Sequence, residues 1–283
     1  MMRKSITIAF AVSILAAAAL SGQSTYKYSW KNDYNPIETP AKRILPPEGY
    51  VRVELKTGSF GDWLRHIPLK PGRPPVYLHN GKLKSNQAAH YAVIDMDVGK
   101  RDLQQCADAI MRVRAEYLYS IGDYDAIHFN FTSGFNFRYD KWRAGYTPKS
   151  YKKGAGWRKS SRVKHSYGDF MSYMTLVFSY AGTHSLSLEL DDVKSISDMR
   201  PGDLFIQGGF PGHAILVVDM AQNPSTGKKV FMLAQSFMPA QEMHILENPT
   251  DPDMSPWYPL DFGETLYTPE WRFQKSDLKR FSS

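Results

Sequence analysis

The amino-acid sequence predicts an α+β fold in which one amphipathic helix packs on an antiparallel sheet. The first observation is the pattern of residues 102–119, where apolar side chains recur every three or four positions, as on the buried face of a helix. The second is a pair of apolar strands, 213–218 and 229–236, which the turn at 223–227 joins as a hairpin. These elements together predict a helix that rests on neighbouring antiparallel strands.

The N-terminus has the pattern of an export signal. Arg3 and Lys4 precede an apolar, alanine-rich run over 6–20 that is too short to span a membrane, and small residues follow it. We expect cleavage near Gly22, so that residues 1–22 form a signal peptide and the protein is periplasmic or extracellular. No transmembrane segment is expected after this cleavage. The remaining 283 − 22 = 261 residues are long enough for one large core.

Composition narrows the choice of partners and of stabilising bonds. The formal net charge is +7, which falls to about +5 when Arg3 and Lys4 are removed. A modest positive charge on an exported protein suits an anionic envelope polymer and argues against nucleic acid as a partner. Cys106 is the single cysteine, so packing must stabilise the fold without an internal disulfide. A lone thiol is either a small buried hydrophobe or a reactive group.

The rest of the chain is expected to form an arm followed by one domain. Residues 23–48 are polar and contain prolines without a period, which is typical of an arm, and 49–283 are expected to form the single domain. Ser59 is a predicted N-cap of a short helix. The other predicted elements are a strand from Gly49, a hairpin at Asn80-Gly81, strands at 89–97, 126–131 and 204–207, and a helix over 170–180 that is buried nearly all round and ended by Gly182.

Residues 138–165 differ from their surroundings in composition. Ten Lys or Arg side chains stand against one acid, Asp140, and several aromatic residues lie among them. We expect a long surface insertion that could grip an anionic envelope polymer or stack on sugars. The alternative is a solvated loop with a few aromatic side chains folded inward.

The stretch from Arg200 to Asp219 is the most informative part of the chain. A Pro-Gly-Asp turn leads into a short strand, and a glycine-rich loop then leads into the strand that begins at His213. A histidine at the edge of a buried strand, with Gly212 leaving room for backbone beside it, is well placed to act as a general base. The alternative is a strand-end histidine that only makes a structural hydrogen bond.

Three polar groups from separate elements are predicted to meet. Cys106 lies in the first turns of the predicted helix, where free amides and the helix dipole favour a thiolate. Hairpin pairing brings Gln235 or Ser236 near His213, where either side chain could orient the imidazole. The amides of Gln105 and Cys106 could supply an oxyanion hole. The pattern therefore indicates a nucleophilic cysteine site, with Cys106 as nucleophile and His213 as base and then acid.

The remaining site predictions are less specific. Trp142 and Trp257 are predicted walls of a substrate pocket. Cys106 shares its helix face with Ile110 and Val113, which is also what an inert core cysteine would do. The other histidines show no metal-ligand spacing and a lone thiol cannot form a thiolate zinc cluster, so no metal and no other cofactor is expected.

Two motifs resemble known cysteine hydrolases. The segment from Pro201 to Asp219 resembles the histidine segment of the NlpC-type cell-wall peptidases. The cysteine segment departs from that family, because Gln105-Cys106-Ala107-Asp108-Ala109 is closer to the Cys-x-Asp-x-Ala helix opening of transglutaminase-like proteins. Both groups share the papain-like arrangement, and the order of cysteine, histidine and polar residue agrees with it. The resemblance implies a papain-like α+β core that acts on a peptide or another amide.

Over most of its length the chain also resembles the domain-of-unknown-function 4846 family of secreted bacterial proteins, whose function is uncharacterised. The strings that carry this resemblance are Gly58–Arg65, Asp102–Ala109, Pro211–Ala214 and Ala234–Gln241. We therefore expect a secreted cysteine amidase or peptidase whose substrate derives from the cell wall. The alternative is a non-catalytic protein that binds the envelope or a glycan on a papain-like scaffold.

Overall fold

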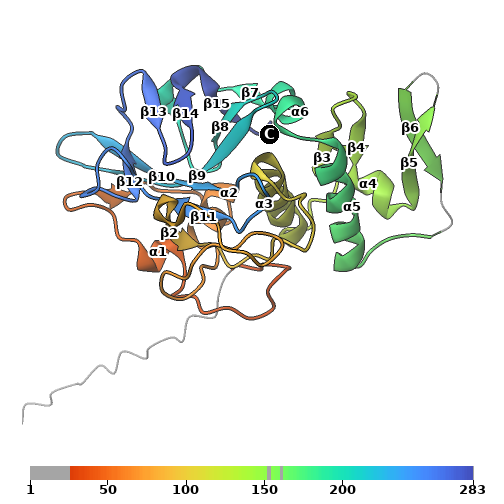
Figure 1. The fold of residues 1–283 in the computed structure, drawn as a ribbon, viewed down its shortest axis with the longest axis horizontal. Helices are drawn as coiled ribbons and strands as arrows, with labels where there is room; N and C mark the ends of the chain where they lie inside the picture. The colour runs from red at the N-terminus through yellow and green to blue at the C-terminus, as the bar shows by residue number, and fades with distance from the viewer. Residues whose placement is uncertain (1–25, 152–153, 160–161, 283) are drawn as a thin grey trace, which may run out of the picture.

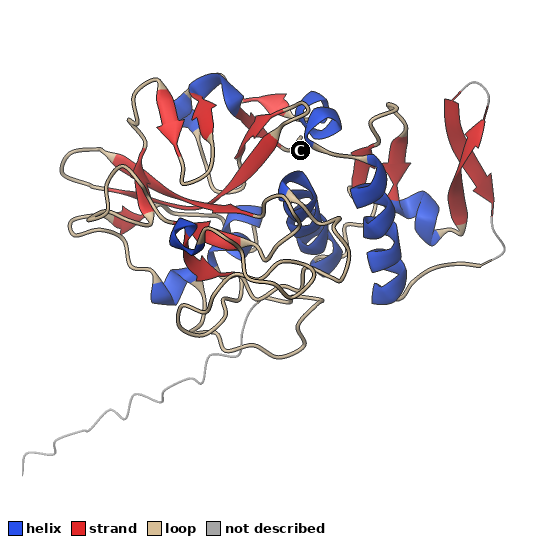
Figure 2. Ribbon diagram, viewed as in Figure 1, coloured by secondary structure: helices blue, strands red, loops and turns tan. Residues whose placement is uncertain are grey.

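The computed structural model describes residues 26–151, 154–159 and 162–282, and the predicted signal peptide lies outside them. The described residues form a mixed α+β fold with mostly antiparallel sheets, as the sequence predicts (Figure 2). A large sheet occupies one side of the molecule, and a lobe of helices and small hairpins occupies the other, with α3 between them (Figure 1). Among the helices described, none has the length and apolar character needed to cross a membrane.

The helices and strands have the following bounds. Helices are α1 Pro40–Arg43, α2 Phe60–Arg65, α3 Cys106–Ser120, α4 Tyr139–Arg143, α5 Tyr167–Tyr180 and α6 Thr183–Glu189. The nine-stranded sheet contains β1 Val51–Arg52, β2 His90–Val93, β7 Asp191–Asp192, β8 Leu204–Gln207, β9 His213–Gln222, β10 Lys229–Gln235, β11 His244–Leu246, β12 Trp257–Pro259 and β15 Leu278–Arg280. Two-stranded sheets pair β3 His128–Asn130 with β4 Asn136–Arg138, β5 Tyr146–Tyr151 with β6 Gly154–Lys159, and β13 Thr265–Tyr267 with β14 Arg272–Gln274.

Strand β9 is the centre of the large sheet. The sheet order is β2-β11-β10-β9-β8-β15-β7, with β1 also paired to β9 and β12 to β10. Side chains alternate between two cores, because successive residues of a strand point to opposite faces. Ala214 and Leu216 belong to the core that α3 covers, whereas Ile215 and Val217 belong to the core that includes Leu278 of β15. This alternation explains why nearly the whole strand is apolar.

Helix α3 begins at Cys106, not at Asp102 as the sequence suggests. Gln105 is the N-cap residue, and its backbone amide lies 3.2 Å from a carboxylate oxygen of Asp108. The Asp102 carboxylate instead accepts hydrogen bonds from the Ala240 amide at 2.7 Å and from the Gln105 side chain at 2.9 Å. A tertiary contact therefore takes the carboxylate that local capping rules assign to the helix, and Cys106 becomes its first residue.

The other predicted elements are confirmed in position but differ in extent. Ser59 caps α2, where its hydroxyl accepts a hydrogen bond from the Asp62 amide at 3.4 Å. Helix α5 is not buried all round, because its buried side chains lie on one face: Phe170, Tyr173, Met174 and Val177. Gly182 does follow α5, but it is also the N-cap of α6, a helix that the sequence pattern did not predict.

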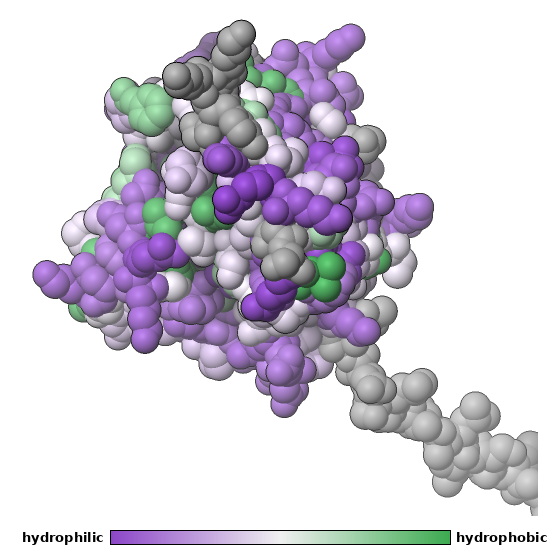
Figure 3. All heavy atoms as spheres, turned by 90° about the vertical axis from the view of Figure 1, so that its right-hand side faces the viewer, coloured by the Kyte–Doolittle hydropathy of each residue, from purple (hydrophilic) through white to green (hydrophobic). Residues whose placement is uncertain are grey.

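The insertion at 138–165 contains α4 and the β5–β6 hairpin. Its aromatic side chains pack inward: Tyr139 and Trp142 are buried, and the Trp157 ring stacks on Phe137 with centroids 5.4 Å apart. The surface on this side of the molecule is mostly hydrophilic, with small separate apolar patches (Figure 3). These rings therefore support the lobe from within, which agrees with the alternative of inward-folded aromatics.

The segment predicted as an N-terminal arm is packed against the domain from Tyr26 onward. The buried Tyr28 side chain donates a hydrogen bond from its hydroxyl to the Trp63 carbonyl at 3.0 Å. Its ring also lies against the Trp63 indole, with centroids 4.8 Å apart. The arm is therefore part of the core around α2.

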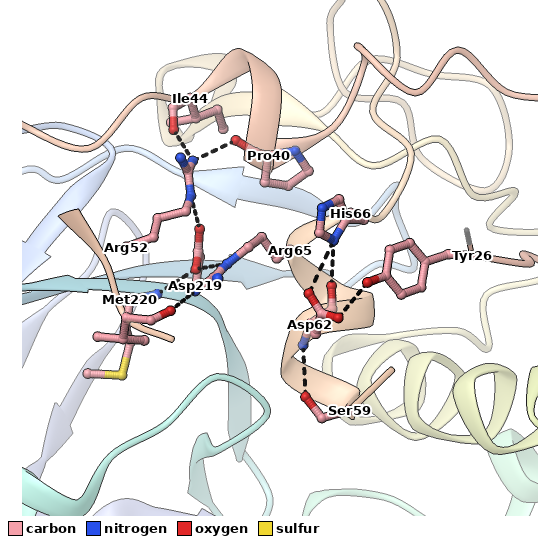
Figure 4. Close-up of polar contacts among 11 residues, drawn as sticks. Tyr26, Pro40, Ile44, Arg52, Ser59, Asp62, Arg65, His66, Asp219 and Met220 are labelled. Atoms are coloured by element: carbon pink, nitrogen blue, oxygen red, sulfur yellow. Dashed lines mark hydrogen bonds and ion pairs between the residues drawn. The ribbon is translucent and has the colours of Figure 1, made fainter. Parts of the chain in front are cut away.

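A buried carboxylate ties this N-terminal region to β9. Asp219 is fully buried and accepts hydrogen bonds from Arg52 Nε and from Arg65 Nε, each at 2.7 Å (Figure 4). The Arg52 guanidinium also donates to the carbonyls of Pro40 at 2.9 Å and Ile44 at 2.6 Å. Asp219 thereby links β9 to β1 and α2, and Arg52 extends this link to the two ends of α1.

Candidate functional site

The first residue of α3 lies against the first residues of β9. Cys106 is 4% exposed, and the backbone amides of Ala107 and Ala214 lie near enough to its sulfur to favour the thiolate. Burial raises the pKa of the Cys106 thiol to about 11, and those amides offset only part of the rise. The thiol is therefore protonated at neutral pH in the conformation described.

The imidazole of His213 is fully buried and bonded on one side only. Its Nε2 atom lies 2.9 Å from Oε1 of Gln235, whereas its Nδ1 atom has no hydrogen-bond partner among the described residues. Burial lowers the pKa of His213 to about 4, so the ring is neutral at pH 7. Because an amide oxygen can only accept, the ring proton lies on Nε2 and Nδ1 keeps its lone pair. This is the tautomer that a base acting through Nδ1 requires.

Two charged side chains behind Gln235 fix the orientation of its amide. Gln235 Nε2 donates to a carboxylate oxygen of Glu270 at 2.7 Å. The other oxygen of Glu270 accepts from the ammonium group of Lys84, whose side chain is almost completely buried. A carboxylate accepts and does not donate, so Glu270 turns the Gln235 oxygen toward His213. Lys84 and Glu270 thus act on the imidazole tautomer through Gln235.

The structure separates the two predicted orienting residues. The β9–β10 pairing places Ala234 opposite Leu216, so Gln235 projects to the face of His213 and Ser236 to the other face. The Ser236 hydroxyl instead lies 2.8 Å from the Gln241 carbonyl and 3.3 Å from the Gln104 carbonyl. Gln235 is therefore the partner of the imidazole, and Ser236 holds the chain that leads into α3.

The thiol and the imidazole make no hydrogen bond with each other among the described contacts. The sulfur lies beside the amide of Ala214, the residue that follows His213, and that amide lowers the pKa of the thiol. His213 shares its strand face with Ile215, on the side of the sheet away from α3. The sulfur therefore reaches the start of β9 beside the strand backbone, and Nδ1 is left unpaired.

The imidazole sits among aromatic rings. Its centroid lies 4.8 Å from the ring of Phe237 and 5.2 Å from that of Trp271. The Trp271 indole N–H donates to Gln207 Oε1 at 2.9 Å, which fixes that ring. These rings exclude water from His213 and account for the low pKa of its imidazole.

The backbone is already occupied at Gln105 and closely packed at Gly212. The amide of Gln105 donates to Asp108 and lies 2.6 Å from the Leu103 carbonyl, so it is not free to bind an oxyanion. A Cβ on Gly212 would lie 2.4 Å from the Thr183 hydroxyl and 2.6 Å from the Gln207 carbonyl, so glycine leaves room there for neighbouring backbone, as the sequence predicts. Gly212 is required for close packing of the loop against α6.

The predicted pocket walls lie elsewhere. The Trp142 indole N–H donates to the Asp169 carbonyl at 2.9 Å inside the lobe. The Trp257 indole N–H donates to the Leu45 carbonyl at 2.9 Å, and its strand pairs beside Met232. Neither tryptophan contributes to the surroundings of His213. The ring contacts come instead from Phe237 and Trp271, which sequence reasoning missed.

Comparison with known proteins gives the kinship of the chain but no activity. Residues 41–280 match the family described as "Domain of unknown function (4846)", so the chain belongs to that family, as the sequence resemblance indicates. No curated protein and no solved structure matches the chain.

Proposed function

We propose that this member of the domain-of-unknown-function 4846 family is an exported cysteine hydrolase with a papain-like core, acting on an amide bond of a cell-envelope peptide. Cys106 is the nucleophile, His213 the base and then the acid, and Gln235 the orienting group. One observation carries the proposal: His213 has Nε2 fixed by Gln235 and an unpaired Nδ1, and the amide of the next residue, Ala214, favours the thiolate of Cys106. Export rests on the pattern of residues 1–22.

The reaction follows from these positions. His213 Nδ1 removes the proton of the Cys106 thiol, and the sulfur attacks the substrate carbonyl carbon to form a carbon–sulfur bond. The tetrahedral intermediate expels the amine, which takes the proton from the His213 imidazolium as the carbon–nitrogen bond breaks. Water then cleaves the thioester with the same histidine as base, and releases the acid and the free thiol. In this proposal the amide of Cys106, at the start of α3, stabilises the negative oxygen of the intermediate.

Access requires the loops around the thiol to open. In the structure described, a substrate carbonyl cannot approach a sulfur that is almost wholly buried. The flanking loops each present a large exposed side chain, Phe210 after β8 and Met238 after β10. We expect reaction with substrate to depend on separation of these loops, while Gln235, Glu270 and Lys84 keep the imidazole in place.

The proposal is tested by the pH dependence of thiol labelling with iodoacetamide. An unassisted thiol has a pKa of about 11. As long as the pH is below that value, its labelling rate rises about tenfold for each unit by which the pH increases. A thiol activated by His213 should instead label at a nearly constant rate from about pH 6 to about pH 8, which is about one unit on either side of neutrality. His213→Ala should restore the steep dependence, and His184→Ala, at an exposed histidine, should leave the wild-type profile unchanged.

The substrate is then sought among peptidoglycan fragments. Incubation with the wild-type protein should release new amino groups, and Cys106→Ala should release none. Labelling that rises steeply with pH in the wild type, and that His213→Ala does not alter, would contradict the hydrolase proposal.

A second candidate function is a non-catalytic protein that binds an anionic envelope polymer. The observation in its favour is that the thiol and the imidazole are both buried and neutral, with no hydrogen bond between them. The exposed basic side chains of the insertion at 138–165, including Lys141 and Arg158, would then provide the binding surface. Co-sedimentation with envelope polymer that Lys141→Gln/Arg158→Gln weakens, and that Cys106→Ala leaves unchanged, would support this candidate.

A further inference from the structure

A pocket of about 460 Å³ lies where α2, the middle of α3, the Pro201-Gly202-Asp203 turn and the end of β15 meet. Neither Cys106 nor His213 is among its lining residues. Its wall is preformed by close packing, because a Cβ on Gly61 of α2 would lie 2.9 Å from the Pro201 carbonyl. Gly202 occupies a left-handed conformation, with φ of 98°, directly beside the ring of Phe60. The pocket is thus a fixed part of the fold, separate from the cysteine site.

Arg114 is the most unusual side chain in this pocket. Its guanidinium carbon lies 5.1 Å from the ring centroid of Phe60, 5.7 Å from that of Tyr117 and 5.4 Å from that of Phe281. Among the described residues it has neither an ion pair nor a hydrogen-bond acceptor, and its nitrogen atoms are not among the buried atoms that lack a partner. The rings therefore cover the guanidinium while its N–H groups still reach solvent in the pocket.

The charges around Arg114 are not balanced. The lining contains four cations, Lys56, Arg114, Arg200 and Arg280, and two acids, Glu54 and Asp203, which leaves 4 − 2 = +2. Arg280 and Asp203 neutralise each other through hydrogen bonds of 2.6 and 2.8 Å. Burial lowers the pKa of Arg114; nearby Tyr117 and Asp123 raise it in part, and the charge of Arg200 lowers it. An anion between the two free guanidinium groups would relieve this repulsion.

We propose that this pocket binds the phosphate group of a phosphate monoester whose organic part is small and apolar. The excess charge of +2 matches a phosphate monoester, which carries about −1.5 to −2 at pH 7. Arg114 and Arg200 supply the planar donors that bind phosphate oxygens in pairs. The rings of Phe60 and Phe281 form an apolar surface beside those donors, on which the organic part can rest.

The test is calorimetric titration of the whole protein with phenyl phosphate at low salt. We expect saturable binding that is tighter than that of inorganic phosphate, because only phenyl phosphate uses the rings. Arg200→Gln should weaken binding about tenfold, as expected for the loss of one charge-assisted contact. Arg114→Gln should weaken it at least as much. Arg101→Gln is the matched control, since Arg101 is also an exposed arginine but lies outside this pocket, and its affinity should equal that of the wild type.

Arg200→Gln decides the outcome if Arg114→Gln fails to fold, because Arg200 is exposed and its side chain supports no described contact. Equal affinities of Arg200→Gln and Arg101→Gln would overturn the proposal. Absence of saturable binding of phenyl phosphate by the wild type would do the same. Equal or tighter binding of benzoate would overturn the assignment of phosphate as the ligand group.

Discussion

Each end of β9 buries a polar side chain, and the two side chains differ in how many of their polar atoms have hydrogen-bond partners. Asp219 near the C-terminal end has both oxygens occupied, by Arg65 Nε and the Met220 amide on one and by Arg52 Nε on the other. His213 at the N-terminal end has Nε2 bonded and Nδ1 unpaired. Both residues are fully buried in the same strand, so burial alone does not explain the difference.

The comparison distinguishes a structural polar group from one that is left available. A buried atom without a partner costs about 1–3 kcal/mol, so folding gives no reason to keep one. Asp219 has the complete set of partners expected when a charge is buried to tie elements together. The open nitrogen of His213 is what the proposed proton transfer requires, although Nδ1 of His79 and Nδ1 of His90 also lack a hydrogen-bond partner among the described residues.

The largest effect is expected at the satisfied end. Asp219→Asn should lower the free energy of unfolding by about 3–5 kcal/mol, because Arg52 and Arg65 both lose their counter-charge. Urea unfolding at pH 7, followed by tryptophan fluorescence, measures the change. Asp192→Asn removes an ion pair whose carboxylate side chain is 78% exposed and should cost less than about 1 kcal/mol. A loss below about 1 kcal/mol in Asp219→Asn would remove the contrast between the two ends.

Glu270→Gln should have the next largest effect. It leaves the buried ammonium of Lys84 without its counter-ion and removes the group that fixes the Gln235 amide, so we expect a loss of about 2–3 kcal/mol. Nitrogen NMR of the His213 ring should show the proton shared between Nδ1 and Nε2, whereas the wild type should hold it on Nε2. Glu264→Gln, at a carboxylate 94% exposed, is the control. An unchanged tautomer in Glu270→Gln would refute the orienting role of Glu270.

Acid pH should destabilise the protein through His213. The pKa of His213 is lowered from 6.5 to about 4, so the unfolded chain binds the proton more readily than the folded one. The stability linked to the neutral ring is complete above about pH 6.5 and is lost as pH falls from about 6.5 to 4. Between pH 7 and 4.5, the wild type should lose about 2 kcal/mol more unfolding free energy than His213→Gln loses. Equal losses, measured by urea unfolding at both pH values, would show that the ring is not held neutral.

The smallest effect is expected at the thiol. Cys106→Ala removes one sulfur atom from a nearly buried site and should cost about 1 kcal/mol in unfolding free energy, measured in the same way. A larger cost, above about 2.5 kcal/mol, would identify Cys106 as a core-packing residue and weaken the case for a reactive group.

The sequence predicts the local elements of the site and misses its long-range contacts. The periodicity of α3 and the hairpin of β9 and β10 are local patterns, and they suffice to bring Cys106, His213 and Gln235 into one region. The start of α3 is misplaced because Asp102 is used by Ala240, a contact 138 residues away. Glu270 was missed for the same reason, since no local pattern around it shows that it faces Gln235. Gly212 leaves room for backbone as the sequence predicts, but that the crowding group is Thr183 of α6 could not be read from a local pattern.

The Lys84–Glu270 pair joins residues 186 positions apart. This separation determines the order in which the groups of the candidate site are synthesised. Synthesis adds Cys106 and then His213 to the chain before it adds Glu270. Until then the Gln235 amide can turn either way, so the histidine proton has no fixed position. A chain that lacks Glu270 would therefore contain Cys106, His213 and Gln235 without the group that orients the Gln235 amide.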